Sequence, residues 1–191
     1  MKRLCLASIL LVTLLVACSS SPSYSGAVID PPKAMPDFTL QSASGPVSLS
    51  EFKGKYVPLF FGYTNCGDLC PTTMANLNYA VQGLGDKASE AQPIFISVDY
   101  LRDTPDTVTK YAHLFNPSLI GLTGTKDEID KVTGEYGIFY ELGPKDASGN
   151  FQVQHTSSVL VLDPSGKLVL TWPQGTTAEQ MKQDLQTLVG G

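Results

Sequence analysis

The chain has few histidines, arginines and cysteines, and this scarcity limits the chemistry that it can carry. It contains 2 histidines and 4 cysteines in 191 residues, and its arginines are Arg3 and Arg102. It also lacks an excess of basic residues, because 13 lysines and arginines stand against 18 acidic residues and give a net charge of -5 at pH 7. Nucleic acid is therefore not an expected partner.

Internal repeats, collagen-like or coiled-coil periodicity and low-complexity stretches are also lacking. With 42% hydrophobic and 16% charged residues, the composition is that of an ordinary globular protein. A chain of this length can bury a substantial core without disulfide bonds. We therefore expect a single globular domain.

An apolar run near the N-terminus is the exception to this ordinary pattern. Lys2 and Arg3 precede about twelve apolar residues, a length typical of a signal peptide and too short to span a bilayer. The sequence "LVAC" that follows resembles the lipobox of bacterial lipoproteins, in which the cysteine is lipidated and begins the mature chain. A signal without lipidation that ends near a cysteine is the alternative. We predict a lipoprotein signal peptide at residues 1–17 and a lipid on Cys18.

These features predict an exported protein, anchored in a membrane and facing the periplasm or the outer side of the cytoplasmic membrane. Residues 18–34 are rich in serine and proline and lack periodicity, so we expect a flexible tether there and a folded domain over residues 35–191. Without Lys2 and Arg3, eleven basic residues face eighteen acidic ones, and the net charge is about -7. A partner is expected at or near the same membrane.

Export also changes what the cysteines can do. Cys5 leaves with the signal peptide and Cys18 carries the lipid, so the domain keeps Cys66 and Cys70. In an oxidising compartment two nearby thiols form a disulfide unless they are reduced or bind a metal. The sequence therefore predicts either a redox-active pair or a metal site at "CGDLC".

Hydrophobic periodicity, turn residues and helix caps indicate alternating strands and helices from residue 37 onward. This order predicts an α/β protein with a thioredoxin-like fold, in which helices flank a mixed central β-sheet and a strand/helix segment is inserted between the two halves. The cysteines then lie between a strand and a helix, where ligands of open α/β sheets bind. Strands are expected at 37–40, 46–49, 56–63, 93–99, 138–142 and 157–172, the last as a hairpin, and helices at 71–84, 104–115, 125–136 and 177–188.

The spacing of the two cysteines suits a soft metal ion. Residues four apart in a helical turn lie on one face, and two thiolates are ligands that Cu(I) prefers. His113 lies in a helix among apolar residues and is expected to be a partly buried surface histidine. His155 precedes the strand of the final hairpin, and the residues alone leave open whether it is a third ligand or an ordinary loop histidine.

Three stretches of the chain together resemble the Sco/SenC family of copper proteins with a thioredoxin fold. These stretches are "LFFGYTNCGDLCPTT", "SVDYLRDTPDTVTKYAHLF" and "QVQHTSSVLVLDPSGKLV", and the likeness runs from about residue 36 to 172. The resemblance implies that Cys66, Cys70 and His155 bind one copper ion per domain, as Cu(I) or Cu(II). Gly67 departs from the family, which usually has proline there, and glycine gives the loop more conformational freedom.

The resemblance further implies a metallochaperone that helps to assemble the dinuclear copper site of cytochrome c oxidase. Its partners would be the copper-site subunit of a membrane-bound respiratory oxidase and a periplasmic copper donor or thiol reductant. The alternative is a thiol-disulfide oxidoreductase, in which Cys66 and Cys70 are the redox-active pair that keeps a partner's copper-ligating cysteines reduced. Both functions need the same two sulfurs in the reduced state.

Other residues and reactions are given less weight. A thioredoxin-type reductase normally has two residues between its cysteines and a proline on the facing loop, and this chain has neither. A peroxiredoxin needs threonine where Gly67 stands, and Arg102 would be the only arginine available to its thiolate. Asp68, Asp99 and Asp103 are expected around the metal ligands rather than among them.

Overall fold

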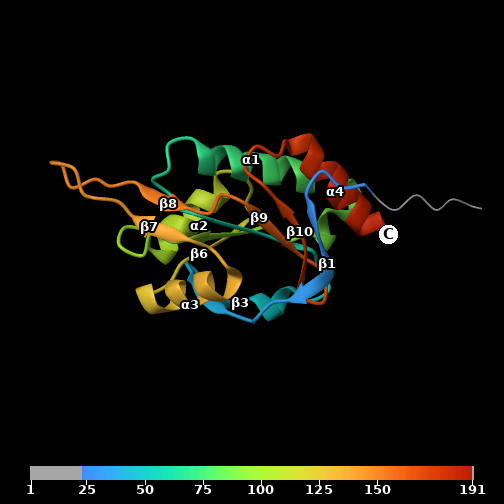
Figure 1. The fold of residues 1–191 in the computed structure, drawn as a ribbon, viewed down its shortest axis with the longest axis horizontal. Coiled ribbons are helices and arrows are strands. Elements are labelled where there is room, and N and C mark those ends of the chain that lie inside the picture. Colours follow the sequence, from blue (N-terminus) through green and yellow to red (C-terminus); the bar gives the residue numbers. More distant parts are fainter. Residues whose placement is uncertain (1–22, 191) are drawn as a thin grey trace, which may run out of the picture.

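The computed structural model describes residues 23–190 (Figure 1). The helices in this range are α1 (Leu69–Gln82), α2 (Pro105–His113), α3 (Lys126–Tyr136) and α4 (Ala178–Gly190), with short 3-10 helices η1 (Leu49–Phe52) and η2 (Gly85–Glu90). The strands are β1 (Ala27–Ala34), β2 (Thr39–Ser42), β3 (Gly45–Ser48), β4 (Val57–Gly62), β5 (Ile94–Ser97), β6 (Ile120–Leu122), β7 (Tyr140–Leu142), β8 (Val153–His155), β9 (Val159–Leu162) and β10 (Lys167–Trp172).

A six-stranded mixed sheet organises the described part of the chain. Its order is β1-β10-β9-β4-β5-β6, in which β4 pairs parallel to β5 and antiparallel to β9. The pairs β2–β3 and β7–β8 form two separate antiparallel hairpins. Helices α1 and α4 pack on each other along one side of the sheet, and α3 lies on the other side (Figure 1). The α/β architecture with a mixed sheet that the sequence predicts is confirmed.

Strand β4 forms the centre of this sheet, and all six of its residues are buried. Pro58 is tolerated there because the pairing with β5 begins one residue later, at Leu59, while Pro58 stands opposite Val161 of β9. Phe60 and Phe61 have no exposed surface. The strand therefore leads the chain from the middle of the core directly to the two cysteines.

Helices α2 and α3 begin at the threonine caps that the sequence predicts, whereas α1 begins and ends two residues before its predicted bounds, at Leu69 and Gln82. Thr104 and Thr125 are the N-caps of α2 and α3, and the hydroxyl of each accepts the backbone N–H three residues later. Gly137 ends α3 with a left-handed φ of 70°, which glycine adopts without steric cost. These capping residues therefore determine where α2 begins and where α3 begins and ends.

The flexible tether expected through residue 34 is too long, because residues 27–34 form β1 at the edge of the main sheet. Ala27 pairs with Thr171 and Ala34 with Lys167 of β10, and the register shifts between Val28 and Lys33. The two prolines of β1 fall within this irregular stretch, and edge strands tolerate prolines that central strands do not. Because these prolines are unusual in a strand, the sequence pattern did not predict β1.

A buried carboxylate holds the chain just before β1. Asp184 of α4 accepts hydrogen bonds from the backbone N–H groups of Ser25 at 2.8 Å and Gly26 at 2.9 Å. The indole N–H of Trp172 donates to the same carboxylate at 2.8 Å. The folded domain therefore begins near residue 25.

The signal peptide and the lipid on Cys18 fall outside the described residues. Between residues 23 and 190, no helix combines the length and the apolar character that crossing a membrane requires.

We expect Asp184→Ala to lower the free energy of unfolding by about 3 kcal/mol, because three donors lose a charged acceptor and two of them belong to the first residues of the domain. Chemical denaturation monitored by Trp172 fluorescence measures this change. Asp86→Ala removes an exposed carboxylate and should shift the same value by less than about 0.5 kcal/mol. Equal effects of the two substitutions would contradict this role of Asp184.

Candidate functional site

The loop between β4 and α1 carries both cysteines, and Gly62 at the end of β4 makes room for one of them. A Cβ atom built on Gly62 would lie 2.8 Å from Cys70 Sγ and 3.0 Å from the ring of Phe95. Any larger residue would therefore displace the sulfur. Sequence reasoning missed this requirement, because it arises from a contact between residues that only the fold brings together.

The two thiols have different surroundings. Cys70 has no exposed surface, whereas Cys66 is half-buried, and both are free. The backbone N–H of Cys70 donates to Cys66 Sγ at 3.3 Å. Asp68 is the N-cap of α1 but its side chain makes no capping bond, so the sulfur of Cys66 takes an N–H that a capping side chain usually accepts. Cys66 thus lies at the N-terminus of α1 with access to solvent.

His155 lies at the end of β8 and meets Cys70. Its Nε2 is 3.7 Å from Cys70 Sγ, and its Nδ1 is 3.0 Å from the carbonyl oxygen of Thr156. Because a carbonyl only accepts, Nδ1 carries the proton and the lone pair of Nε2 faces the sulfur. The rings of Phe60 and Tyr63 pack edge-on against the imidazole and fix its plane.

Burial keeps both groups of this pair neutral. It raises the pKa of the Cys70 thiol and lowers the pKa of His155 below its ordinary value of 6.5. At neutral pH the imidazole can therefore bind a metal without losing a proton. Cys70 has to release its proton when it becomes a ligand, so metal binding here would release protons.

The structure brings Cys70 and His155 together, but Cys66, the third expected ligand, is not grouped with them in a metal-binding arrangement. Across residues 23–190, no three histidine, cysteine, aspartate or glutamate side chains stand close enough to hold one ion. Cys66 would have to turn from the N–H of Cys70 toward the pair. The loop has room for such a turn, because a Cβ atom built on Gly67 would meet no neighbour within 4 Å, and glycine adds conformational freedom.

Asp103 fixes the start of the cysteine loop. This buried carboxylate accepts the backbone N–H of Thr64 at 2.9 Å and the hydroxyl of Thr64 at 2.5 Å, and it also accepts the hydroxyl of Ser97. It therefore holds the loop two residues before Cys66 and forms its hydrogen bonds with Thr64 and Ser97 rather than with the thiols. Asp68, by contrast, is exposed between the cysteines.

Asp99 is buried and forms an ion pair with Arg102, whose Nε donates a hydrogen bond to the carboxylate at 2.5 Å. Arg102 in turn donates to the carbonyl oxygen of Phe151 at 2.9 Å, and its guanidinium carbon lies 3.7 Å from the centre of the Phe151 ring. Sequence reasoning considered Arg102 only as a possible peroxidase residue. The sequence offered one sign of a special place, which is that Arg102 is the only arginine after Arg3.

Other residues with metal-binding side chains lie elsewhere. His113 is exposed at the end of α2. Met74, one turn after Cys70, is 1% exposed and belongs to the hydrophobic core. Within the described range, His155 is thus the histidine available to the cysteines.

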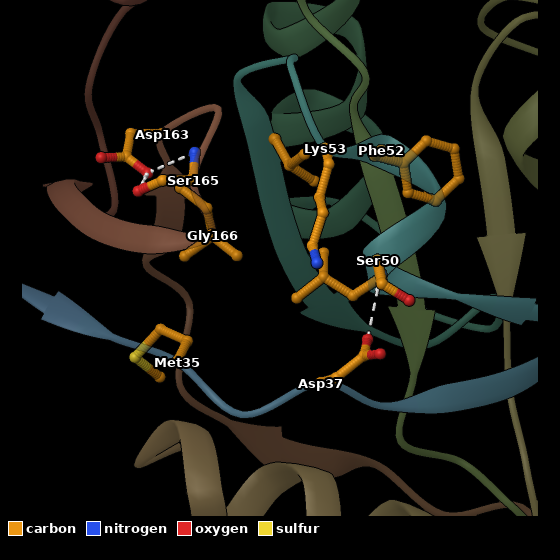
Figure 2. Close-up of a pocket in the computed structure, with 11 residues that line it drawn as sticks. Met35, Asp37, Ser50, Phe52, Lys53, Asp163, Ser165 and Gly166 are labelled. Atoms are coloured by element: carbon orange, nitrogen blue, oxygen red, sulfur yellow. Dashed lines mark hydrogen bonds between the residues drawn. The ribbon is translucent and has the colours of Figure 1, made fainter.

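A separate hollow of about 220 Å³ lies near the beginning of β4, away from the cysteine loop that follows the strand's end (Figure 2). Lys53 points into it, and Asp37 and Asp163 stand at its edges (Figure 2). Asp37 accepts the backbone N–H of Ser50, and Asp163 accepts the backbone N–H and hydroxyl of Ser165. Local turns already use these carboxylates, so the hollow offers no convergent set of ligands.

Comparison with known proteins decides the family. The family model described as SCO1/SenC matches residues 27–190. The chain belongs to the SCO1/SenC family. The bovine mitochondrial protein SCO2 homolog is 34% identical over 153 residues, which cover 78% of this chain and 58% of the relative. The yeast mitochondrial protein SCO2 is 33% identical over 160 residues, 80% of this chain and 53% of the relative. The chain thus spans little more than half of these curated relatives.

Solved Sco structures confirm the thioredoxin-like fold. Apo Sco1 from Thermus thermophilus superposes with a TM-score of 0.80 at 36% identity, covering 87% of this chain and 97% of that one. Bradyrhizobium japonicum ScoI, solved with copper bound, gives 0.74 at 34% identity and covers 81% and 99%. BsSco, described as a cytochrome c oxidase assembly protein with a disulfide switch, gives 0.64 at 25% identity and covers 84% and 95%.

The unequal burial of the two thiols of this Sco protein predicts unequal reactivity. In reduced native protein at about pH 8, iodoacetamide should label Cys66 at least about tenfold faster than Cys70, because Cys70 is buried and its burial raises the pKa of the thiol. Mass spectrometry of timed samples measures both rates. In Cys66→Ser, labelling of the domain should require denaturant. Equal rates at the two positions in native protein would show that this difference in burial is absent in solution.

Proposed function

We propose that this protein is a membrane-tethered copper metallochaperone that serves the assembly of the dinuclear copper site of a cytochrome c oxidase. The observation that carries the proposal is the pair of Cys70 Sγ and His155 Nε2, 3.7 Å apart, with the accessible thiol of Cys66 at the start of the same helix. Sco relatives solved with copper bound support the choice of metal. The description of BsSco supports the choice of client.

The chemistry of the donors fits copper. Two thiolates suit Cu(I), and an imidazole suits both oxidation states. The lone pair of His155 Nε2 already faces the site, since Nδ1 donates to the carbonyl of Thr156. Copper is the cargo here, so the site has to release it as well as bind it.

The different exposure of the ligands supports such a release. Cys66 and His155 are both half-buried, but Cys66 lies on a loop with a glycine beside it, whereas Cys70 has no exposed surface and the rings of Phe60 and Tyr63 pack against His155. A partner's thiolate can therefore approach from the side of Cys66 and replace it first. We place Cys66 at the exchange step and the other two ligands at the retention of the ion.

The tether limits where this exchange takes place. With a lipid on Cys18 and the chain fastened by Asp184 at Ser25, about eight residues remain, and these reach at most about 29 Å. The client's copper site should therefore lie close to the membrane. A subunit of a membrane-bound respiratory oxidase meets this condition, and a periplasmic copper donor or thiol reductant would have to reach the same cysteines.

A thiol-disulfide oxidoreductase is the second candidate, and the arrangement of one accessible and one buried thiol favours it. In that reaction the Cys66 thiolate attacks a partner's disulfide, and one partner sulfur leaves as a thiolate. The Cys70 sulfur then displaces the other, which leaves a Cys66–Cys70 disulfide here and two reduced thiols on the partner. An external dithiol has to return the two electrons before the next cycle.

Copper titration tests the first proposal. Reduced soluble domain should bind one copper ion and, when Cu(II) is supplied, show thiolate-to-copper charge-transfer absorption. The Cys66→Ser/Cys70→Ser double variant should lose both properties. If wild-type protein binds no copper, or if the double variant binds it equally well, the metallochaperone proposal is wrong.

His155 distinguishes the two candidates. An imidazole is a copper ligand, but a thiolate does not need it to attack a disulfide. His155→Ala should therefore weaken copper retention, at least about tenfold for Cu(II), and change reduction of a model disulfide little. His113→Ala is the matched control and should change neither, because His113 is exposed at the end of α2. Oxidase assembly in cells at limiting copper then decides between the two functions. If cells with His155→Ala still assemble active oxidase while cells with either cysteine variant do not, the protein is a reductase.

A further inference from the structure

The strand that carries His155 is not part of the main sheet. Strands β7 and β8 pair with each other alone, with Tyr140 opposite His155 and Leu142 opposite Val153. The hairpin extends to one end of the molecule (Figure 1). Backbone pairing with the six-stranded sheet therefore does not set the distance between His155 and the cysteines.

Side chains from elsewhere in the fold hold this hairpin instead. Arg102 donates to the carbonyl oxygen of Phe151 at 2.9 Å, and the Tyr63 hydroxyl donates to the side chain of Gln152 at 2.8 Å. The Tyr140 hydroxyl donates to Asp130 of α3. The first two contacts fall on the residues immediately before β8.

Arg102 has the most extensive of these contacts. Its guanidinium carbon lies 3.7 Å from the centre of the Phe151 ring and 5.8 Å from that of Tyr63, so it packs between the hairpin and the cysteine loop. Tyr63 in turn packs its ring against the imidazole of His155. Asp99, which has no exposed surface, fixes the guanidinium through Nε. A planar, fixed cation can make all of these contacts at once.

We propose that Arg102 is a positioning residue for His155. It clamps Phe151 and thereby holds β8 so that Nε2 of His155 faces the cysteine sulfurs. The proposal rests on the copper site described under the proposed function. Without the clamp, the hairpin can move away and leave a site with two sulfur ligands.

Stability alone does not account for an arginine here. One terminal nitrogen of Arg102 is covered and has no hydrogen-bond partner among the described residues. An unpaired covered donor costs free energy, and a partly buried ion pair can often be replaced by apolar side chains of similar volume without loss of stability. An apolar side chain in place of Arg102 would not reproduce its hydrogen bond to the carbonyl oxygen of Phe151 or its cation–π contact with the Phe151 ring.

Loss of the clamp should affect the two oxidation states of copper differently. Cu(I) is satisfied by two thiolates, whereas Cu(II) depends more strongly on a nitrogen ligand. We therefore expect Arg102 variants to retain Cu(I) nearly as well as wild type and to lose Cu(II). A general loss of structure would weaken both together.

Two variants and one control test the proposal. Arg102→Lys keeps a positive charge beside Asp99 but lacks the planar fork and face. Arg102→Met with Asp99→Asn removes the clamp without leaving a buried charge unpaired. Lys182→Met is the matched control, because Lys182 also pairs with a carboxylate three residues away and lies 5.7 Å from the ring of a tyrosine, on α4 and away from the hairpin.

The first measurement needs no copper. Hydrogen exchange of the amides of residues 151–156 in apo protein should be at least about tenfold faster in both Arg102 variants, and exchange in β4 and β9 should be unchanged. Lys182→Met should match wild type throughout. Unchanged exchange at residues 151–156 in both variants would overturn the proposal.

The second measurement uses copper. Competition with a chelator should show Cu(II) retention reduced at least about tenfold in both variants and Cu(I) retention within about threefold of wild type. The charge-transfer spectrum of the Cu(II) form should change as it does in His155→Ala. Equal losses of Cu(I) and Cu(II) would overturn the proposal. Absence of copper binding by wild-type protein would instead refute the proposed function, and the exchange measurement would still decide whether Arg102 holds the hairpin.

Discussion

The contact between Cys70 and His155 is the interaction on which the site depends. One partner belongs to the junction of β4 and α1, at the centre of the main sheet, and the other to a hairpin outside that sheet. Gly62 leaves room for the sulfur, and the carbonyl of Thr156 orients the imidazole. The geometry of the site therefore depends on how firmly two separately built parts of the fold are held together.

The sequence predicted the parts of the structure that local signals determine. The apolar run of β4 ending at the cysteines, and the threonine caps of α2 and α3, follow from residues within a few positions of each other. The same local reading missed β8, whose three residues alternate too briefly to show a period, and β1, which two prolines interrupt. Strand β1 is stabilised by pairing with β10, which is distant in the sequence, and β8 by pairing with β7 across the intervening loop.

The residues of the candidate site also fall into those that local sequence signals could identify and those that they could not. The cysteines could be identified by their spacing and by elimination of the other two thiols, whereas His155 needed the resemblance to a family. Gly62 and the contacts of Arg102 with Phe151 could not be found, because they join residues 8 and 49 positions apart whose meeting depends on the fold. A scarce residue type, here the single arginine after Arg3, was the only local sign of such a role.

The attachment of Ser25 and Gly26 to Asp184 also determines which end of the domain a lipid anchor on Cys18 would hold. The first described residues lie beside α4 at one end of the long axis, and the β7–β8 hairpin lies at the other end (Figure 1). If a lipid on Cys18 anchors the domain, the ligands lie roughly 30 to 40 Å from the anchored end, about the width of a domain of this size, and the tether adds at most about 29 Å to their height above the bilayer. A recipient would then have to raise its own metal-binding loops to that height, or the domain would have to lie on its side.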